Sequence, residues 1–224
     1  MIFKIASVDS LIIYFGEKID QEIALNVKKA YISLKKLNLE GIVELIPSYT
    51  SIFITYDIFK YDFKSLKNLL MKNINLDLID GFEEKIITID VYYNQEVGID
   101  LEQMSEKTKL SIDEIIEIHS NKLYDVYAVG FLPGFAYLAS VDKRIALPRL
   151  ETPRKQIPKG SVAIANTQTA VYPQASPGGW NIVGRTAMEL FDKNLESLSP
   201  FNVGDKVKFN SISKEEFLSQ GGII

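Results

Sequence analysis

The segment that most constrains the fold is 127–186, where short apolar runs alternate with glycine and proline. Six of the eight prolines of the chain fall in it. Glycine and proline interrupt regular structure and mark turns, so the elements between them must be short. Many short strands joined by such turns indicate an antiparallel β-sandwich or β-barrel.

The flanking sequence from residue 82 onward extends this pattern. A β-branched and aromatic run over 85–93 predicts a first strand, and Asp80 and Gly81 before it mark a domain boundary. Further strands are expected over 122–129, 161–165, 170–172, 180–183, 189–191 and 206–212. Helices are expected over 100–107 (opened by Asp100), 112–119 and 214–220. We therefore predict an antiparallel β domain over 82–224.

Residues 1–81 show a different pattern, in which strands alternate with amphipathic helices. Strands are expected over 10–15, 42–46 (ended by Pro47), 51–56 and 76–79. Helices are expected over 20–38, with Asp20 as its N-cap, and over 62–73. The order strand, helix, strand, strand, helix, strand is the split βαβ arrangement of ferredoxin-like domains, so the first domain is predicted to be ferredoxin-like.

The composition excludes several classes of site and partner. With no cysteine and one histidine, the chain offers no disulfide, no thiolate and no donor set for zinc. Its net charge of -4 argues against nucleic acid, because a phosphate-reading domain normally carries a basic excess. No apolar run approaches the roughly 18 residues of a membrane span, and the first residues lack a secretory signal. We expect a cytoplasmic protein without a membrane partner.

The four arginines of the chain all lie in the segment 127–186. They are Arg144, Arg149, Arg154 and Arg185. Arginine presents a rigid planar fork of five donors that matches a carboxylate or a phosphate, whereas lysine is a flexible point charge. Their concentration predicts a surface that binds carboxylate or phosphate. Ordinary surface ion pairs are the alternative interpretation.

His119 has two interpretations. It follows the apolar face of the helix expected over 112–119, which Ser111 and Glu114 open as a capping box. At that position it either balances the negative end of the helix or satisfies a buried hydrogen bond. Alternatively it is a general acid or base, since its unperturbed pKa lies near neutrality.

A pair of glycines, Gly178 and Gly179, precedes Trp180. Paired glycines let backbone N–H groups approach an oxyanion or phosphate closely, although a tight turn between strands explains them equally well. Residues 179–186 have the spacing of a phosphate-binding P-loop with arginine in place of lysine. Their strand-like interior argues against that motif, which needs a flexible loop.

Six sequence blocks in the second half carry a resemblance to a known family. They are GFLPGFAYL (130–138), PRLETPR (148–154), PKGSVAIA (158–165), QTAVYP (168–173), SPGGW (176–180) and GRT with LFD (184–186 and 190–192). In order and spacing they resemble the family that contains the B subunit of 5-oxoprolinase, the sporulation kinase inhibitor KipI and allophanate hydrolase subunit 1. The resemblance implies a ferredoxin-like domain followed by a cyclophilin-like antiparallel β-barrel.

Three positions depart from the pattern of the family. Asn166 and Ala170 stand where the family usually has glycine, and Ala187 where it usually has proline. Asparagine tolerates left-handed backbone geometry and alanine is the smallest replacement, so we expect the turn to persist. Ala170 narrows the approach of a ligand to its strand.

The resemblance implies a subunit of an ATP-dependent 5-oxoprolinase, which acts with subunits A and C to convert 5-oxoproline to L-glutamate. The isolated chain is then expected to be inactive, with ATP bound in the complex and Mg²⁺ as a further candidate, and no metal site on this chain. His119 and Arg185 are the catalytic candidates. The candidates for binding the substrate or an anion are Arg149, Arg154, Gln168, Tyr172, Gly178, Gly179 and Trp180.

Two other functions follow from the same resemblance. One is a KipI-like protein that inhibits a sensor histidine kinase through a docking surface of aromatic side chains and arginine. The other is a component of a hydrolase of the allophanate or urea-amidolyase type. The sequence blocks are shared by all three kinds of protein, so the sequence alone leaves these alternatives open.

Overall fold

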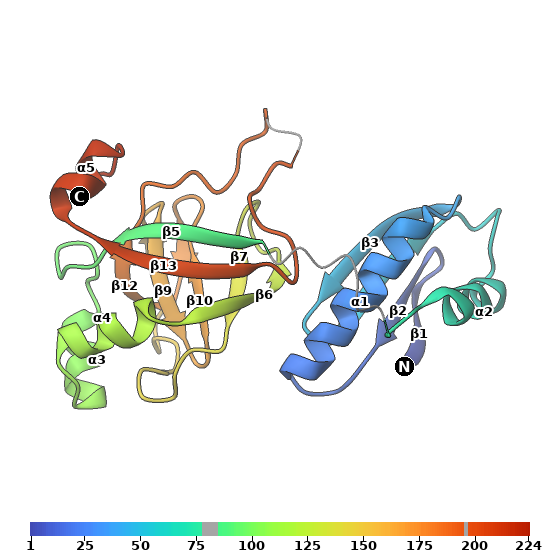
Figure 1. Ribbon diagram of the computed structural model, residues 1–224, viewed down its shortest axis with the longest axis horizontal. Coiled ribbons are helices and arrows are strands. Elements are labelled where there is room, and N and C mark those ends of the chain that lie inside the picture. Colours follow the sequence, from blue (N-terminus) through green and yellow to red (C-terminus); the bar gives the residue numbers. More distant parts are fainter. Residues whose placement is uncertain (78–84, 195–196) are drawn as a thin grey trace. The chain divides into compact units, whose positions relative to one another are not determined.

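The computed structural model describes residues 1–77, 85–194 and 197–224 of the chain. The chain divides into two compact units, Met1–Glu83 and Glu84–Ile224 (Figure 1). The boundary predicted near Gly81 lies outside the described residues and stays a prediction. Among the described residues, no helix combines the length and the apolar composition needed to cross a bilayer.

In its described residues, 1–77, the first unit is a four-stranded antiparallel sheet with two helices on one face (Figure 1). The strand order is β1-β2-β4-β3, with β1 at Ile2–Ser7, β2 at Ser10–Tyr14, β3 at Ile42–Ser48 and β4 at Ser51–Tyr56. The helices are α1 (Gln21–Leu37) and α2 (Phe63–Asn73). Alternate strand residues such as Leu11 and Ile52 form one core with Leu34, Leu66 and Leu70 of the helices. The apolar side chains that recur every two residues in the strands thus pack against those that recur every 3.6 residues in the helices.

The ferredoxin-like order predicted for this unit is not confirmed. Leu76 and Asp77 are not in a strand, and the rest of the expected strand over 76–79 lies outside the described residues. The position beside β2 is held instead by β1, which the sequence did not predict because Phe3 is its one side chain packed on the core. Pro47 does not end β3, since an edge strand can accommodate a residue without an N–H.

The second unit is built on a closed β-barrel. Within the described residues its seven strands follow the order β10-β7-β6-β13-β5-β12-β9. Their bounds are β5 (Ile86–Tyr92), β6 (Leu123–Val129), β7 (Ala136–Ala139), β9 (Ser161–Ala165), β10 (Gln168–Val171), β12 (Asn181–Arg185) and β13 (Lys206–Ile212). The barrel is not purely antiparallel as predicted, because the first and last strands, β5 and β13, run parallel to each other.

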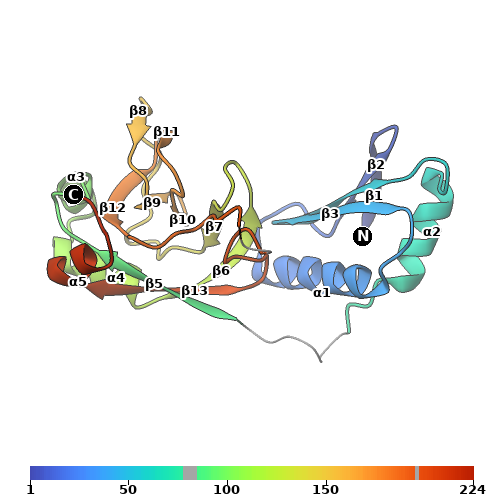
Figure 2. The same ribbon diagram turned by 90° about the horizontal axis from the view of Figure 1, so that it is seen from above.

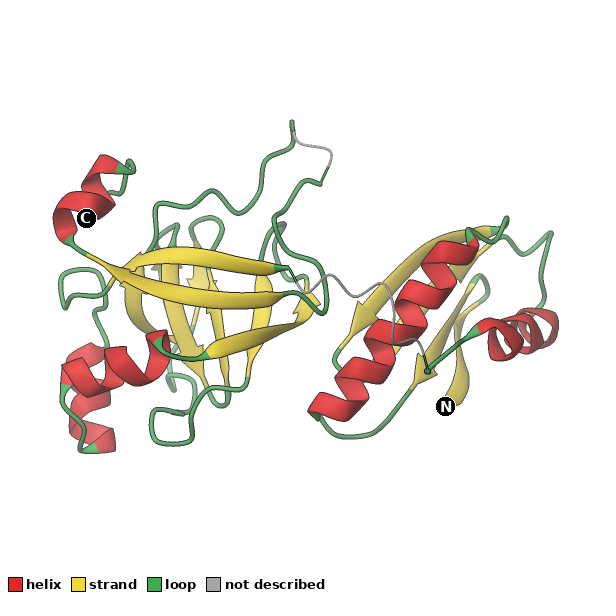
Figure 3. Cartoon of the chain, viewed as in Figure 1, coloured by secondary structure: helices red, strands yellow, loops and turns green. Residues whose placement is uncertain are grey.

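Three helices and a two-stranded arm surround the barrel. The helices are α3 (Leu101–Thr108), α4 (Ile112–Ser120) and α5 (Lys214–Ser219). The arm pairs β8 (Arg154–Ile157) with β11 (Ser176–Gly178) and projects from the barrel in Figure 2. The strand expected over 189–191 is wrong: the chain there is a loop, anchored by the buried Leu190 alone (Figure 3).

The wall of the barrel has an apolar cluster on each face. Val162 and Ile164 of β9 point into the barrel core, whereas Ala163 and Ala165 face a second cluster that includes Ile157 of the arm. Alanines on this outer face leave room for large rings beneath the arm. Asn166, which follows β9, has a φ of 52°, which confirms the left-handed geometry expected there.

We expect Leu70→Ala to destabilise the first unit by about 2–5 kcal/mol, because the side chain is fully buried between helix and sheet. Met71→Ala on the same helix is the matched control, since this side chain is largely exposed and its loss should have little effect. The free energy of unfolding of both variants is measured in urea, with amide hydrogen exchange in the first unit as the readout. Equal losses for the two variants would contradict this packing.

Candidate functional site

The pocket with the most distinctive chemistry lies at the base of the arm in the second unit. We call it the aromatic–arginine pocket; its cavity volume is about 260 Å³. It is lined by Phe131, Phe135, Tyr137, Arg149, Pro153, Tyr172, Pro177, Gly178, Gly179 and Trp180. These residues come from segments up to 49 positions apart, which the barrel and the arm bring together. Five of the predicted site residues are among them: Arg149, Tyr172, Gly178, Gly179 and Trp180.

Phe135 organises the aromatic side chains of this pocket. Its ring, which is almost fully buried, makes edge-to-face contacts with Tyr137 (4.9 Å between centroids), Tyr172 (5.4 Å) and Trp180 (5.9 Å). Phe131 packs on it in the same way at 5.4 Å, yet is 63% exposed and has a φ of 77°. Edge-to-face packing fixes the orientation of rings, so the walls are preorganised. These phenylalanines and Tyr137 were not among the predicted site residues, although their spacing in the block GFLPGFAYL is a signal.

Arg149 is the only charged side chain that lines the pocket. Its guanidinium carbon lies 5.7 Å from the centroid of the Trp180 ring. No carboxylate among the described residues forms an ion pair with it. The Arg149 side chain makes no hydrogen bond within the described part of the chain, so its N–H donors are available to a ligand. The pocket is therefore positively charged and suited to an anion.

Tyr172 places a neutral hydroxyl beside this cation. The residue is 2% exposed, and burial raises the pKa of its hydroxyl to about 12, although Arg149 and Arg154 lower it in part. Burial also raises the pKa of the neighbouring Tyr137. Both hydroxyls are therefore protonated at neutral pH and able to donate.

The two glycines of the pocket differ in what they permit. A Cβ at position 178 would lie 2.4 Å from the Tyr172 hydroxyl oxygen and 2.7 Å from Ile157. At position 179 the nearest atom would be the Leu150 carbonyl oxygen at 3.5 Å, an ordinary contact. Gly178 is thus required for the close approach of the Tyr172 hydroxyl. The role of both glycines as backbone donors to an anion stays a prediction.

Arg154 does not have the free guanidinium expected of an anion-binding residue. Its two terminal nitrogens donate to the two carboxylate oxygens of Asp100 at 2.9 and 2.6 Å. The Asp100 carboxylate, with 4% exposure, also accepts from the backbone N–H of Ile182 at 2.7 Å. Asp100 opens α3 at its N-cap position, as predicted, but its side chain makes no cap hydrogen bond to the helix. This ion pair joins the arm to the barrel.

Arg185 and Gln168 lie outside the pocket. Arg185 ends β12 opposite Ser161 and donates to the carbonyl of Ile223 at 2.9 Å, and burial lowers the pKa of its guanidinium. Gln168 begins β10, so four residues of extended chain, about 13 Å, separate it from Tyr172. The four arginines therefore do not form one surface, because Arg144 pairs with Asp142 in a surface loop.

His119 is buried in the barrel core rather than in the pocket. Its Nδ1 lies 2.7 Å from the Tyr93 hydroxyl and its Nε2 lies 2.9 Å from Thr169 Oγ1, while the ring stacks on Phe209 at 4.6 Å. Thr169 donates to the carbonyl of Ala163, so it accepts from Nε2–H and leaves Nδ1 to accept from Tyr93. Burial lowers the pKa of His119 to about 3. This environment favours the structural interpretation.

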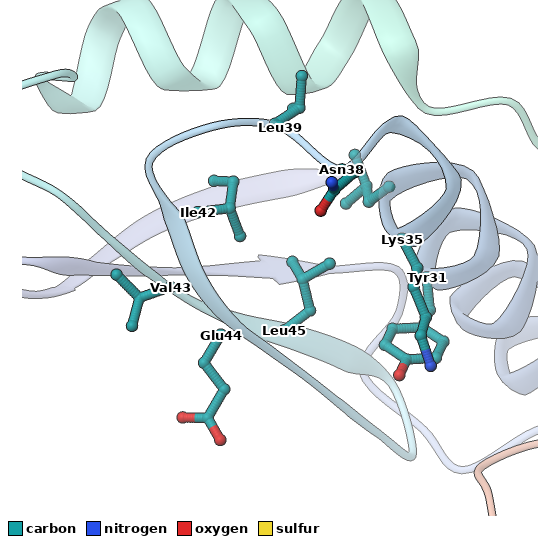
Figure 4. A pocket seen from close by; sticks show the side chains of 9 residues that line it. Tyr31, Lys35, Asn38, Leu39, Ile42, Val43, Glu44 and Leu45 are labelled. Carbon is teal, nitrogen blue, oxygen red and sulfur yellow. The ribbon is translucent and has the colours of Figure 1, made fainter.

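Other parts of the described chain offer less chemistry. A pocket of about 280 Å³ in the first unit lies between the end of α1 and β3 (Figure 4). Its polar groups do not converge, since Glu44 points away from the ring of Tyr31 in Figure 4. No group of three or more histidine, aspartate or glutamate side chains in the described residues is placed to hold a metal ion.

Comparison with known proteins identifies close relatives. Residues 1–201 match the family described as carboxyltransferase domain, subdomain C and D. The chain is 36% identical to the B subunit of 5-oxoprolinase from Bacillus subtilis, covering 93% of this chain and 91% of that protein. It is 37% identical to the corresponding B subunit from Haemophilus influenzae, covering 76% and 79%.

More distant similarity reaches larger proteins. Urea amidolyase of Lachancea kluyveri is 24% identical, over 92% of this chain and 13% of that protein. The crystal structure of TTHA0988 superposes with a TM-score of 0.82 at 30% identity and covers 91% of this chain. This chain spans 40% of the length of TTHA0988.

We expect Arg154→Gln to lower the free energy of unfolding by about 3–5 kcal/mol, because it leaves the buried Asp100 carboxylate without its charged partner. Arg144→Gln breaks a similar bidentate pair in an exposed loop and should cost far less, since solvent screens that pair. Urea unfolding of both variants measures the difference. A loss for Arg154→Gln no larger than for Arg144→Gln would show that the arm does not depend on the pair.

We expect the His119 ring to remain neutral between pH 8 and pH 5. As the chain has one histidine, its imidazole proton resonance is identified without assignment. Because the pKa of His119 in the folded state lies below the ordinary 6.5, protonation favours unfolding. The free energy of unfolding should therefore decrease as the pH is lowered from about 6.5 to about 3, by up to about 1.4 kcal/mol per pH unit. His119→Asn should remove this contribution to the pH slope. A resonance that titrates near pH 6.5 would restore the acid–base interpretation.

Proposed function

The chain belongs to the family of 5-oxoprolinase B subunits, and from this we propose that it is the B subunit of an ATP-dependent 5-oxoprolinase. The observation that carries the proposal is the 36% identity to the Bacillus subtilis protein of that name across 91% of its length. The match therefore extends over nearly the whole of the relative and not over one shared domain. We infer that the chain acts in a complex with subunits A and C and is inactive alone.

The proposed reaction opens a five-membered lactam. Water adds to the amide carbonyl of 5-oxoproline and the C–N bond breaks, which gives L-glutamate, while hydrolysis of ATP with a second water gives ADP and phosphate. The barrier falls when donors stabilise the negative charge that develops on the carbonyl oxygen. The substrate also needs a cation for its carboxylate, and Arg149 in the aromatic–arginine pocket supplies one.

This pocket suits the lactam better than ATP. Its volume of about 260 Å³ is below the range of about 300–1,000 Å³ usual for sites of drug-sized ligands. Its one cation is too few for a triphosphate. No carboxylate lines it, so its donors do not fit Mg²⁺, which prefers carboxylate and phosphate oxygens. We propose that ATP and any Mg²⁺ bind elsewhere in the complex.

The alternative of a urea-amidolyase type of hydrolase has weaker support. The identity to urea amidolyase is 24%, against 36% to the Bacillus subtilis 5-oxoprolinase protein, and the chain corresponds to 13% of the amidolyase. Inhibition of a sensor histidine kinase, the other function that the sequence suggested, stays a hypothesis.

The test is reconstitution of this chain with subunits A and C of a 5-oxoprolinase. We expect ATP-dependent release of glutamate from 5-oxoproline that requires this chain, and no turnover of allophanate. Arg149→Gln should lower kcat/KM by about 10–100-fold, as expected for loss of a charge-assisted hydrogen bond. Arg144→Gln, which removes an arginine outside the pocket, should retain activity. Full activity without this chain would refute the proposal.

A further inference from the structure

We propose that the aromatic–arginine pocket binds 5-oxoproline in one orientation, with the carboxylate on Arg149 and the lactam carbonyl oxygen accepting a hydrogen bond from the Tyr172 hydroxyl. This inference rests on the proposed function and assigns the substrate to particular atoms of this chain. Tyr172 thereby becomes a catalytic residue that touches the carbonyl where the ring opens. The inference rests on three features of the pocket, which concern its hydroxyl, its cation and its walls.

The first feature is a hydroxyl at the pocket that has no hydrogen-bond partner within the described part of the chain. Tyr172 is 2% exposed, and its hydroxyl makes no hydrogen bond to another residue in the described part of the chain. The oxygen lies against Gly178, which lines the pocket as Tyr172 does. A hydroxyl that is left unpaired by the protein and lies at a pocket is available to donate to a ligand. A ligand carbonyl supplies that partner here.

The second feature is the way in which Arg149 is held. Its guanidinium lies over the Trp180 ring, 5.7 Å from the centroid, and has no ion pair among the described residues. Its N–H groups, which make no hydrogen bond within the described part of the chain, match a bidentate acceptor such as a carboxylate. Burial keeps Tyr172 protonated, whereas Arg149 is cationic, so the pocket offers one cationic and one neutral donor. An acid that carries one amide carbonyl matches this pair.

The third feature is the shape of the walls. Phe135 and Trp180 pack edge to face at 86° and both line the pocket, so its aromatic walls are fixed in orientation and its small volume of about 260 Å³ suits a small ring. In 5-oxoproline the carboxylate and the carbonyl stand on the two ring carbons that flank the nitrogen, so both can be held at once. L-proline lacks the carbonyl, 2-pyrrolidinone lacks the carboxylate, and L-glutamate is an open chain that loses more conformational freedom on binding than a ring does. The pocket should therefore prefer the substrate to its product.

The same arrangement favours the reaction. A hydrogen bond from Tyr172 polarises the carbonyl and strengthens as negative charge develops on its oxygen. Gly178 permits this position of the hydroxyl, because a Cβ there would occupy the space of the oxygen. Gly130 does not line the pocket, and a Cβ there would meet no atom within 4 Å, so it serves as the control.

The test uses the intrinsic fluorescence of the full-length chain without other subunits. Trp180 is the only tryptophan, so a change in emission reports on this pocket. We expect a saturable change with 5-oxoproline, and at least 10-fold weaker binding of L-proline, 2-pyrrolidinone and L-glutamate. Tyr172→Phe should weaken binding of 5-oxoproline about 3–10-fold and Arg149→Gln about 10–100-fold. Gly178→Ala should weaken it, and Gly130→Ala, outside the pocket lining, should not.

Two substitutions outside the pocket control for general effects. Tyr61→Phe removes a hydroxyl in the first unit, and Arg144→Gln removes a surface arginine. Both should bind as the unmodified chain does. Absence of a saturable change, or unaltered affinity in Tyr172→Phe, would overturn the inference. If the complex with A and C is active in that case, the proposed function stands without this site; if it is inactive as well, both fail.

Discussion

The pocket depends on one buried ion pair, in which the Asp100 carboxylate accepts three N–H groups. Two come from Arg154 at the start of β8 and one from the backbone of Ile182 in β12. Through β8 the pair fixes β11 and with it Gly178, which opposes Arg154 in the register of the arm. The arm has only two strands and little core of its own, and such a ribbon is marginally stable in isolation. Asp100 therefore connects the stability of the arm to the geometry of the candidate site.

Much of the fold follows from local sequence patterns, and the failures have identifiable physical causes. The helix capped by Asp20 and the capping box of Ser111 are confirmed. Both were predictable because the cap residue and the helical pattern of apolar residues are close together in the sequence. The short strands β7, β8 and β11 were missed, since three or four residues give no period to detect. The strand expected over 189–191 rested on apolar character alone, and Leu190 is an isolated anchor.

The site was predicted in part. The sequence blocks located Arg149, Tyr172 and Trp180, which do share a pocket. Clustering of arginines along the chain did not mean clustering in space, because Arg154 is neutralised by a residue 54 positions earlier that no local pattern reveals. His119 illustrates the same limit: a polar residue on an apolar helix face fits either interpretation until Tyr93 and Thr169 are seen to saturate its ring.

The parallel pair of β5 and β13 has a consequence for the order in which the barrel forms during synthesis. β13 lies between β5 and β6, although more than 75 residues separate it from β6 along the chain. Until the ribosome has released this last strand, the sheet has a gap, and β5 and β6 present unpaired backbone edges on either side of it. Such edges recruit other strands, so the nascent chain is vulnerable to aggregation between the synthesis of β6 and that of β13. The barrel therefore closes only when β13 inserts between the exposed edges of β5 and β6.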